Sequence, residues 1–232
     1  DNVGTTLDAE ENAILGVFPD IDGFENAQFF QHSINRYSAR IVYRERNRQK
    51  NIKRKYNFSQ FNQLQNKVKN HPEITEVILS GGDPFMLGDR ALASLCKDLD
   101  AIEHVQRLRI HSRTPVTFPD RITDGLVRAL RTAKPMVLVT HFNHPKEITD
   151  PVKQGLQRIQ SVGIEIANQS VLLKGVNDDI DLLAQLCNEL AELGVRPYYL
   201  HHLDAAPGTH HFRVSLARGL IIYRAFCRTL PA

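Results

Sequence analysis

The sequence predicts an α/β protein: a partial (β/α)6 TIM-like barrel that follows an irregular N-terminal arm. Three observations lead to this prediction. From about residue 76 onward, short apolar runs alternate with segments of helical periodicity, which is typical of a parallel sheet with covering helices. Polar residues follow five consecutive apolar runs, as expected where parallel strands end. The chain has 232 residues, of which 42% are hydrophobic, enough for one substantial core but not for two comfortable domains.

Six strands and five helices are predicted in alternation. The apolar runs place strands at 40–43, 77–80, 108–112, 137–140, 164–168 and 197–200. Apolar residues at three- and four-residue spacing place helices at 58–70, 89–102, 123–133, 151–162 and 179–193. We expect Thr123 and either Asp178 or Asp179 to cap helices, and Gly163 and Gly194 to end them. Six units are fewer than the eight of a closed barrel, so the barrel is expected to be partial.

The first 35 residues differ from the rest. They contain several glycine, asparagine and aspartate residues but little periodicity. We therefore expect an irregular arm at 1–35, which covers part of the barrel or a neighbouring subunit, and a single barrel domain at 36–232.

The composition predicts a soluble protein of a reducing compartment. No stretch approaches the roughly 20 apolar residues of a membrane span, and no secretory leader is recognisable. The cysteines, Cys96, Cys187 and Cys227, are odd in number and far apart, which argues against a disulfide framework. The cytoplasm is the expected location, or another reducing compartment such as the mitochondrial matrix.

Positive charge is concentrated in one stretch, although the net charge is only +3. Residues 40–55 contain eight lysines or arginines and one glutamate. This basic stretch is interpreted as a solvated connector, or as a contact for phosphate, another anion or an acidic partner. No interleaved aromatic residues accompany it, so the sequence does not indicate nucleic-acid contact. The exception would be a contact made by this basic stretch itself.

Polar clusters follow the second to sixth predicted strands. They are Ser80-Gly81-Gly82-Asp83-Pro84, His111-Ser112-Arg113-Thr114-Pro115, His141-Phe142-Asn143-His144-Pro145, Asn168-Gln169-Ser170 and His201-His202-Leu203-Asp204. The carboxyl ends of parallel strands meet at one mouth, which is where such folds bind ligands. We therefore expect a small-molecule site there.

Each cluster also has a purely structural interpretation. Gly81-Gly82 forms a tight turn or presents its backbone N–H groups to a ligand. Arg113 binds an anion or braces its loop. His141, Asn143 and His144 form a metal site or a hydrogen-bonded loop, and the lack of a nearby carboxylate or cysteine disfavours the metal.

The last two clusters offer hydrogen-bonding groups for a ligand. Asn168 and Gln169 can pair with an adenine or carboxylate edge, and Asp204 can accept from an ammonium group.

Five segments together resemble the lysine 2,3-aminomutase family of radical S-adenosylmethionine enzymes. They are SGGDPFML, RIHSRTPVTFPDRIT, VTHFNHPKEIT, NQSVLLKGVND and VRPYYLHHLDAAPGTHHFR. The family includes the enzyme that makes β-lysine for modification of elongation factor P, and the resemblance runs over about 36–230. It implies a radical S-adenosylmethionine type of six-stranded barrel that holds a 4Fe-4S cluster, S-adenosylmethionine and pyridoxal phosphate.

The resemblance also implies roles for residues of the strand-end clusters. The S-adenosylmethionine site would comprise Ser80, Gly81, Gly82, Asp83, His141 and Gln169. The substrate or pyridoxal phosphate pocket would comprise Arg113, Asn143, Asn168, Ser170, His202 and Asp204, the last holding the substrate amino group.

Two features depart from the family pattern. The family carries three cluster cysteines spaced C-x-x-x-C-x-x-C after the first strand, whereas residues 44–48 read RERNR here. None of the three cysteines present has that spacing, so the sequence assigns no metal ligand. The sequence also ends before the family's glycine-rich segment with the lysine that binds pyridoxal phosphate, and neither Lys146 nor Lys174 lies in its place.

Three functions are compatible with these features. The first is a catalytically degenerate barrel, with no catalytic residue or cofactor of its own, that acts as a structural or assembly subunit with protein partners or by self-association. The second is an active lysine 2,3-aminomutase, which converts L-lysine to β-lysine and whose cluster loop and C-terminal segment are missing from this sequence. The third is a small-molecule binder without radical chemistry.

Overall fold

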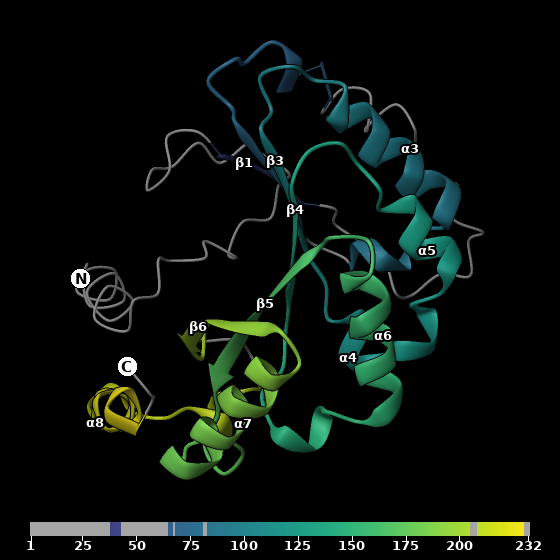
Figure 1. The fold of residues 1–232 in the computed structure, drawn as a ribbon. Coiled ribbons are helices and arrows are strands. Elements are labelled where there is room, and N and C mark those ends of the chain that lie inside the picture. Colours follow the sequence, from purple (N-terminus) through teal and green to yellow (C-terminus); the bar gives the residue numbers. More distant parts are fainter. Residues whose placement is uncertain (1–37, 43–64, 67, 81–82, 205–207, 230–232) are drawn as a thin grey trace, which may run out of the picture. The chain divides into compact units, whose positions relative to one another are not determined.

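The computed structural model describes residues 38–42, 65–66, 68–80, 83–204 and 208–229, and for 38–42 only the backbone. The chain divides into two compact units, which are treated separately below. One unit contains residues 24–139 and 154–165, and the other contains 1–23, 140–153 and 166–232. The first unit spans the start of the sheet, and the second spans its last two strands and the two last helices (Figure 1).

Four parallel strands in chain order form the sheet of the first unit. They are β1 (Ser38–Val42), β2 (Glu76–Ser80), β3 (Arg107–His111) and β4 (Met136–Thr140). Side chains alternate between the two faces of a strand, and the residues Val77, Leu79, Leu108, Ile110 and Leu138 are almost completely buried on one face. This face supplies the core of the unit.

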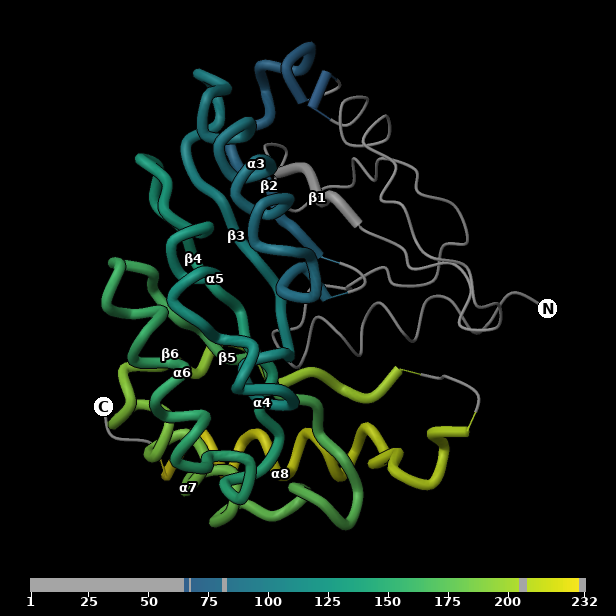
Figure 2. The backbone as a smooth tube through the Cα atoms, turned by 90° about the vertical axis from the view of Figure 1, so that its right-hand side faces the viewer, coloured from purple at the N-terminus to yellow at the C-terminus, as the bar shows by residue number. Residues whose placement is uncertain are grey.

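Helices follow these strands as the alternation predicts. They are η1 (Pro84–Met86), α3 (Asp89–Asp100), α4 (Thr114–Thr117), η2 (Pro119–Arg121) and α5 (Asp124–Ala129). α3 and α5 pack side by side, as both ribbon and tube show (Figures 1 and 2). Helix α6 (Asp150–Gln160) has its first turn in the second unit and the remainder in the first.

The second unit contains the parallel pair β5 (Glu165–Leu172) and β6 (Val195–His202). Its helices are η3 (Pro145–Glu147), α7 (Ile180–Glu192), η4 (His210–Phe212) and α8 (Leu216–Thr229). α7 and α8 contact each other, and a buried cluster joins them to β5. Its members are Leu172, Leu183, Val214, Ile222 and Phe226.

The predicted α/β class is confirmed, because parallel strands alternate with helices as in a partial β/α barrel. Thr123 and Asp179 cap α5 and α7 with their side chains, as predicted. Gly163 and Gly194 adopt positive φ angles of 82° and 68° just after helices, the conformation in which glycine ends a helix.

Several boundaries differ from the prediction. β5 continues four residues beyond the expected end at 168, so Asn168, Gln169 and Ser170 lie inside a strand. α5 ends at Ala129 instead of 133, because the Asp100 carboxylate accepts hydrogen bonds from the backbone N–H groups of Ala133 and Lys134 and holds them outside the helix. α4 lies between 112 and 123, where no helix or strand was predicted.

Some predictions fall outside the described residues. They concern the arm at 1–35, the basic stretch beyond Val42, the helix at 58–64 and the glycines 81 and 82. Within the described ranges, no helix has the length and apolar character that crossing a bilayer requires.

Candidate functional site

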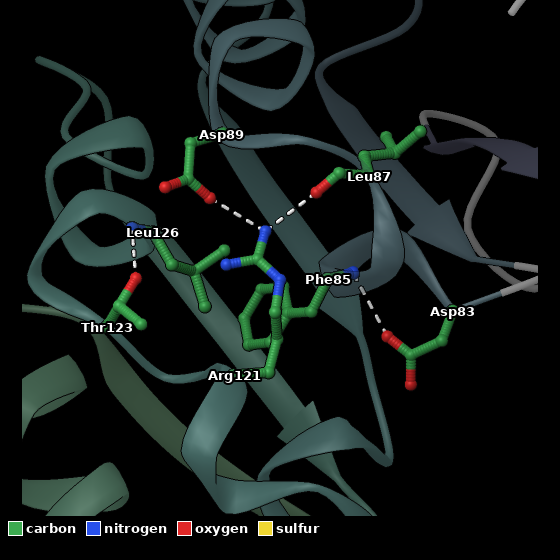
Figure 3. Close-up of polar contacts among 7 residues, drawn as sticks. All are labelled: Asp83, Phe85, Leu87, Asp89, Arg121, Thr123 and Leu126. Carbon is green, nitrogen blue, oxygen red and sulfur yellow. Dashed lines mark hydrogen bonds and ion pairs between the residues drawn. The ribbon is translucent and has the colours of Figure 1, made fainter.

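The Asp83 carboxylate joins the turn after β2 to the turn after β3. Its Oδ1 accepts hydrogen bonds from Phe85 N at 3.0 Å and from Ser112 Oγ at 2.6 Å. Its Oδ2 accepts from the backbone N–H groups of Arg113 at 2.7 Å and Thr114 at 3.0 Å. Figure 3 shows the contact with Phe85, which caps the N-terminus of η1. Asp83 therefore organises two strand ends of the first unit.

The other predicted residues of this unit that the structure describes are Ser80 and Arg113. Ser80 is the last residue of β2 and is buried. Arg113 is exposed and precedes α4, with its backbone N–H held by Asp83.

In the second unit, asparagine side chains connect the segment after β4 to β5. Asn168 Oδ1 accepts a hydrogen bond from Phe142 N at 2.7 Å, and Asn168 Nδ2 donates to Phe142 O at 3.2 Å and to Ser170 Oγ at 3.0 Å. Ser170 Oγ also donates to Phe142 O at 2.6 Å. Asn143 Oδ1 accepts from Val171 N at 2.8 Å. All three predicted residues Asn143, Asn168 and Ser170 are buried, and this network uses most of their polar atoms.

Asn177 completes the network, and the sequence interpretation assigned it no role. It is fully buried, donates from Nδ2 to Asn143 O at 2.9 Å and Val171 O at 2.8 Å, and accepts at Oδ1 from Leu173 N. In the sequence it stands before Asp178-Asp179, next to a predicted helix cap, so its pattern does not distinguish it from a solvated loop residue.

His144 and Glu147 form a reciprocal capping box at η3. His144 Nδ1 accepts a hydrogen bond from Lys146 N at 3.0 Å, while Glu147 Oε2 accepts from Asn143 N at 2.6 Å and His144 N at 3.1 Å. The hydrogen-bonded loop is thus the interpretation that this geometry favours for the cluster 141–145. His141, directly after β4, is half-buried.

Gln169 differs from its neighbours. It lies between Asn168 and Ser170 but is only partly buried, and within the described part of the chain its side-chain amide makes no hydrogen bond. The register of β5 and β6 shifts here, since Asn168 pairs with Pro197 whereas Gln169 pairs with Tyr199. The amide of Gln169 therefore has a donor and an acceptor that no described residue occupies.

The two remaining predicted residues lie at and after the end of β6. His202 is buried, with Nε2 2.7 Å from Val214 O, so the ring ties β6 to the segment before α8. Asp204 is exposed and has no hydrogen-bond partner among the described residues.

The cysteines occupy three different helices. Cys96 is buried in α3, and burial raises its pKa to about 12. Burial also raises the pKa of Cys187, in α7, to about 11. Cys227 is exposed on α8, and its hydrogen bond to Tyr223 raises the pKa of that phenol. Among the described residues, no group of three His, Cys, Asp or Glu side chains is arranged to hold a metal ion.

Comparison with known proteins identifies relatives that share one name. No family model matches the chain. The L-lysine 2,3-aminomutase of Haemophilus influenzae is 49% identical over 155 residues, which are 66% of this chain and 46% of the relative. The L-lysine 2,3-aminomutase of Escherichia coli is 48% identical over 149 residues, 64% of this chain and 44% of the relative. That of Bacillus subtilis is 37% identical over 155 residues, 67% of this chain and 33% of the relative.

The matched segment covers only part of this chain and only part of each relative. The chain spans less than half the length of these three relatives. The matches are also shorter than the segment 36–230 over which the sequence was expected to resemble the family. Identity of 37 to 49% over about two thirds of the chain nevertheless establishes common ancestry for that part. By this matched segment, the chain belongs to the lysine 2,3-aminomutase family.

Proposed function

We propose that this chain binds S-adenosylmethionine at the carboxyl ends of its strands, as a barrel of the radical S-adenosylmethionine type. The observation that carries the proposal is Gln169, a partly exposed amide that makes no hydrogen bond with the described residues, next to buried and hydrogen-bonded Asn168 and Ser170. Because Asn168 and Ser170 are held by hydrogen bonds, they fix the backbone that carries Gln169. Binding sites present hydrogen-bonding side chains from such a fixed backbone. The resemblance to the family supplies the identity of the ligand.

The residues of the strand ends divide into two roles under this proposal. Gln169 and Asp204 have polar groups that no described residue occupies, so they are the residues proposed to contact ligands directly. Asn168, Ser170, Asn143 and His202 hold backbone segments in place. They shape the pocket through the segments after β4 and β6 and not by direct contact.

The cysteines of this chain do not fit a 4Fe-4S cluster. Cluster irons need thiolates, and burial favours the neutral thiol at Cys96 and Cys187. Cys187 also packs against the apolar residues of α7, α8 and β5, and not beside other possible cluster ligands among the described residues. We therefore derive no radical step from these residues, and S-adenosylmethionine binding is proposed without a cluster held by them. A structural subunit role with protein partners is compatible with this proposal.

A second candidate is isomerisation of L-lysine to β-lysine by the whole protein. The common name of the relatives and an identity of 49% favour it. A cluster bound by residues other than Cys96, Cys187 and Cys227 is a requirement of this candidate. Assays of iron and sulfide after anaerobic reconstitution, with chromatography of β-lysine formed from L-lysine, test it directly.

Calorimetric titration of S-adenosylmethionine into the iron-free protein tests the main proposal. Wild type is expected to saturate at one site. Gln169→Ala should weaken binding by about fivefold, since a neutral hydrogen bond contributes about 1 kcal/mol. Gln185→Ala is the matched control, because Gln185 is exposed on α7 and, among the described residues, its side chain hydrogen-bonds only to Glu189 of its own helix. Equal losses in both variants would contradict a specific role for Gln169.

A further inference from the structure

The carboxylate of Asp83 has no acceptor capacity left for a ligand. A carboxylate offers about four lone-pair positions on its two oxygens. Asp83 uses them for Phe85 N, Ser112 Oγ, Arg113 N and Thr114 N, at 2.6 to 3.0 Å. A ligand ammonium group would have to displace one of these donors. The resemblance, in contrast, implies that Asp83 meets the methionyl end of S-adenosylmethionine.

Three of the four donors come from the turn after β3, about 30 positions along the chain. β2 and β3 are neighbouring parallel strands, with Leu79 opposite Ile110. Their backbone ladder stops near these residues, and the Asp83 side chain extends the connection between the two chain segments beyond it. Thr114 is buried, so its N–H would have little access to water if the carboxylate were lost.

We propose that Asp83 is a positioning residue, which fixes the backbone of Arg113 and Thr114 against the turn after β2 and does not contact the ligand. Arg113 is an exposed residue whose backbone N–H is held by this carboxylate, so its position depends directly on Asp83. The ligand-binding part of this inference rests on the proposed function. The structural part, the dependence of the β3–α4 turn on Asp83, does not.

Hydrogen–deuterium exchange read by mass spectrometry tests the structural part. Asp83→Asn keeps Oδ1 as an acceptor but replaces Oδ2 by an NH₂ group, which cannot accept from Arg113 N or Thr114 N. Exchange at these two amides should rise by about tenfold, as expected when a local hydrogen bond of ordinary strength is lost. Asp120→Asn is the matched control, because this exposed side chain in η2 makes no hydrogen bond within the described part of the protein.

Ser112→Ala gives a milder perturbation in case Asp83→Asn does not fold. It removes the hydroxyl that donates to Asp83 and accepts from Thr114 N at 3.2 Å, but it leaves the carboxylate in place. Exchange at Thr114 should rise by a smaller factor than in Asp83→Asn.

Titration of S-adenosylmethionine into the same variants tests the positioning role. Faster exchange together with weaker binding, in the same order of variants, supports the proposal. Unchanged exchange in Asp83→Asn overturns it. Weaker binding with unchanged exchange would also overturn it, because the carboxylate would then contact the ligand directly. Faster exchange with unchanged binding would refute the positioning role. A wild type without binding contradicts the proposed function, whereas faster exchange in Asp83→Asn would still support the dependence of the turn on Asp83.

Discussion

The side-chain amide of Asn168 hydrogen-bonds to both backbone polar groups of Phe142: Oδ1 accepts from Phe142 N at 2.7 Å, and Nδ2 donates to Phe142 O at 3.2 Å. The Asn168 side chain thus supplies Phe142 with the two hydrogen bonds that the backbone of a neighbouring strand would otherwise supply. Both partners are buried, so water cannot take over these bonds when the side chain is removed.

Asn168→Ala should therefore lower the free energy of unfolding by about 2 to 3 kcal/mol, the cost of leaving buried backbone groups unsatisfied. Urea denaturation followed by circular dichroism measures this change. Gln169→Ala, one position along, should change it by less than about 0.5 kcal/mol because that amide makes no bond within the described residues. Similar values for the two variants would contradict the asparagine network.

Gly125 lies close to the carboxylate of Asp89. A Cβ at this position would come within 2.3 Å of Asp89 Oδ2, while Asp89 Oδ1 is 2.7 Å from Arg121 Nη2. Figure 3 shows Arg121 between Asp89 and the carbonyl of Leu87, to which the same nitrogen donates at 2.7 Å.

Gly125→Ala should destabilise the protein by about 1 kcal/mol, because Asp89 has to leave a partly exposed ion pair of modest value. In an Asp89→Ala background the same substitution should not destabilise, and it should stabilise by up to about 1 kcal/mol because alanine is favoured over glycine in a helix. Gly155→Ala in α6 is the matched control, since its Cβ would meet Ile122 Cγ1 at 3.4 Å, and it should stabilise by up to about 1 kcal/mol. Equal costs of Gly125→Ala in both backgrounds would rule out the contact with Asp89.

The N-cap of α5 allows a smaller test of local structure. Thr123 Oγ1 accepts a hydrogen bond from Leu126 N at 3.2 Å (Figure 3). Thr123→Ala should lower the stability by about 1 kcal/mol, whereas Thr123→Ser, which keeps the hydroxyl, should have little effect. A serine variant as unstable as the alanine variant would show that the methyl group, and not the cap, matters.

The three thiols should react with iodoacetamide in a defined order. The thiolate is the reactive form, and burial raises the pKa of Cys96 to about 12 and that of Cys187 to about 11, whereas Cys227 is exposed. At about pH 8, where ordinary thiols begin to ionise, mass spectrometry should detect labelling of Cys227 first and Cys96 last. If Cys96 were labelled as fast as Cys227 in the native protein, the burial of the Cys96 side chain in α3 would be contradicted.

The same shifts predict how stability depends on pH. The folded protein keeps the protons of Cys96 and Cys187 in a pH range where the unfolded chain releases them. Their contribution to stability is therefore complete below the ordinary thiol pKa and decreases as the pH rises above it. Urea denaturation of Cys96→Ala should have a weaker alkaline dependence than that of wild type.

The order of strands and helices was predictable because the patterns are local. Runs such as 76–80 and 136–140 are apolar and bounded by polar residues, and caps such as Thr123 and Asp179 have side chains that act within three residues of their own position. Hydrophobic periodicity and capping chemistry are sufficient for such elements.

The end of β5 was not predictable for the opposite reason. Asn168 and Ser170 look like loop residues in the sequence, and only their bonds to Phe142, 26 and 28 positions away, make them compatible with a buried strand. The early end of α5 likewise depends on Asp100, more than 30 positions from the amides that it binds. Local patterns contain no information on such partners.

The candidate site was predictable as a set of positions but not as a set of roles. Resemblance selected Asp83, Asn143 and Asn168 as ligand contacts, whereas the described hydrogen bonds engage their side chains within the protein. Gln169 and Asp204 are the predicted residues whose side chains make no hydrogen bond among the described residues, and the register shift beside Gln169 has no recognisable motif in the sequence.

Equilibrium dialysis of radiolabelled S-adenosylmethionine against the iron-free protein tests the central claim most directly. About one molecule should be bound per chain in the absence of any cluster, because Gln169, whose amide no described residue occupies, is part of the chain itself. No retained radiolabel at ligand concentrations up to about 1 mM, the upper end of ordinary enzyme–ligand affinities, would contradict it.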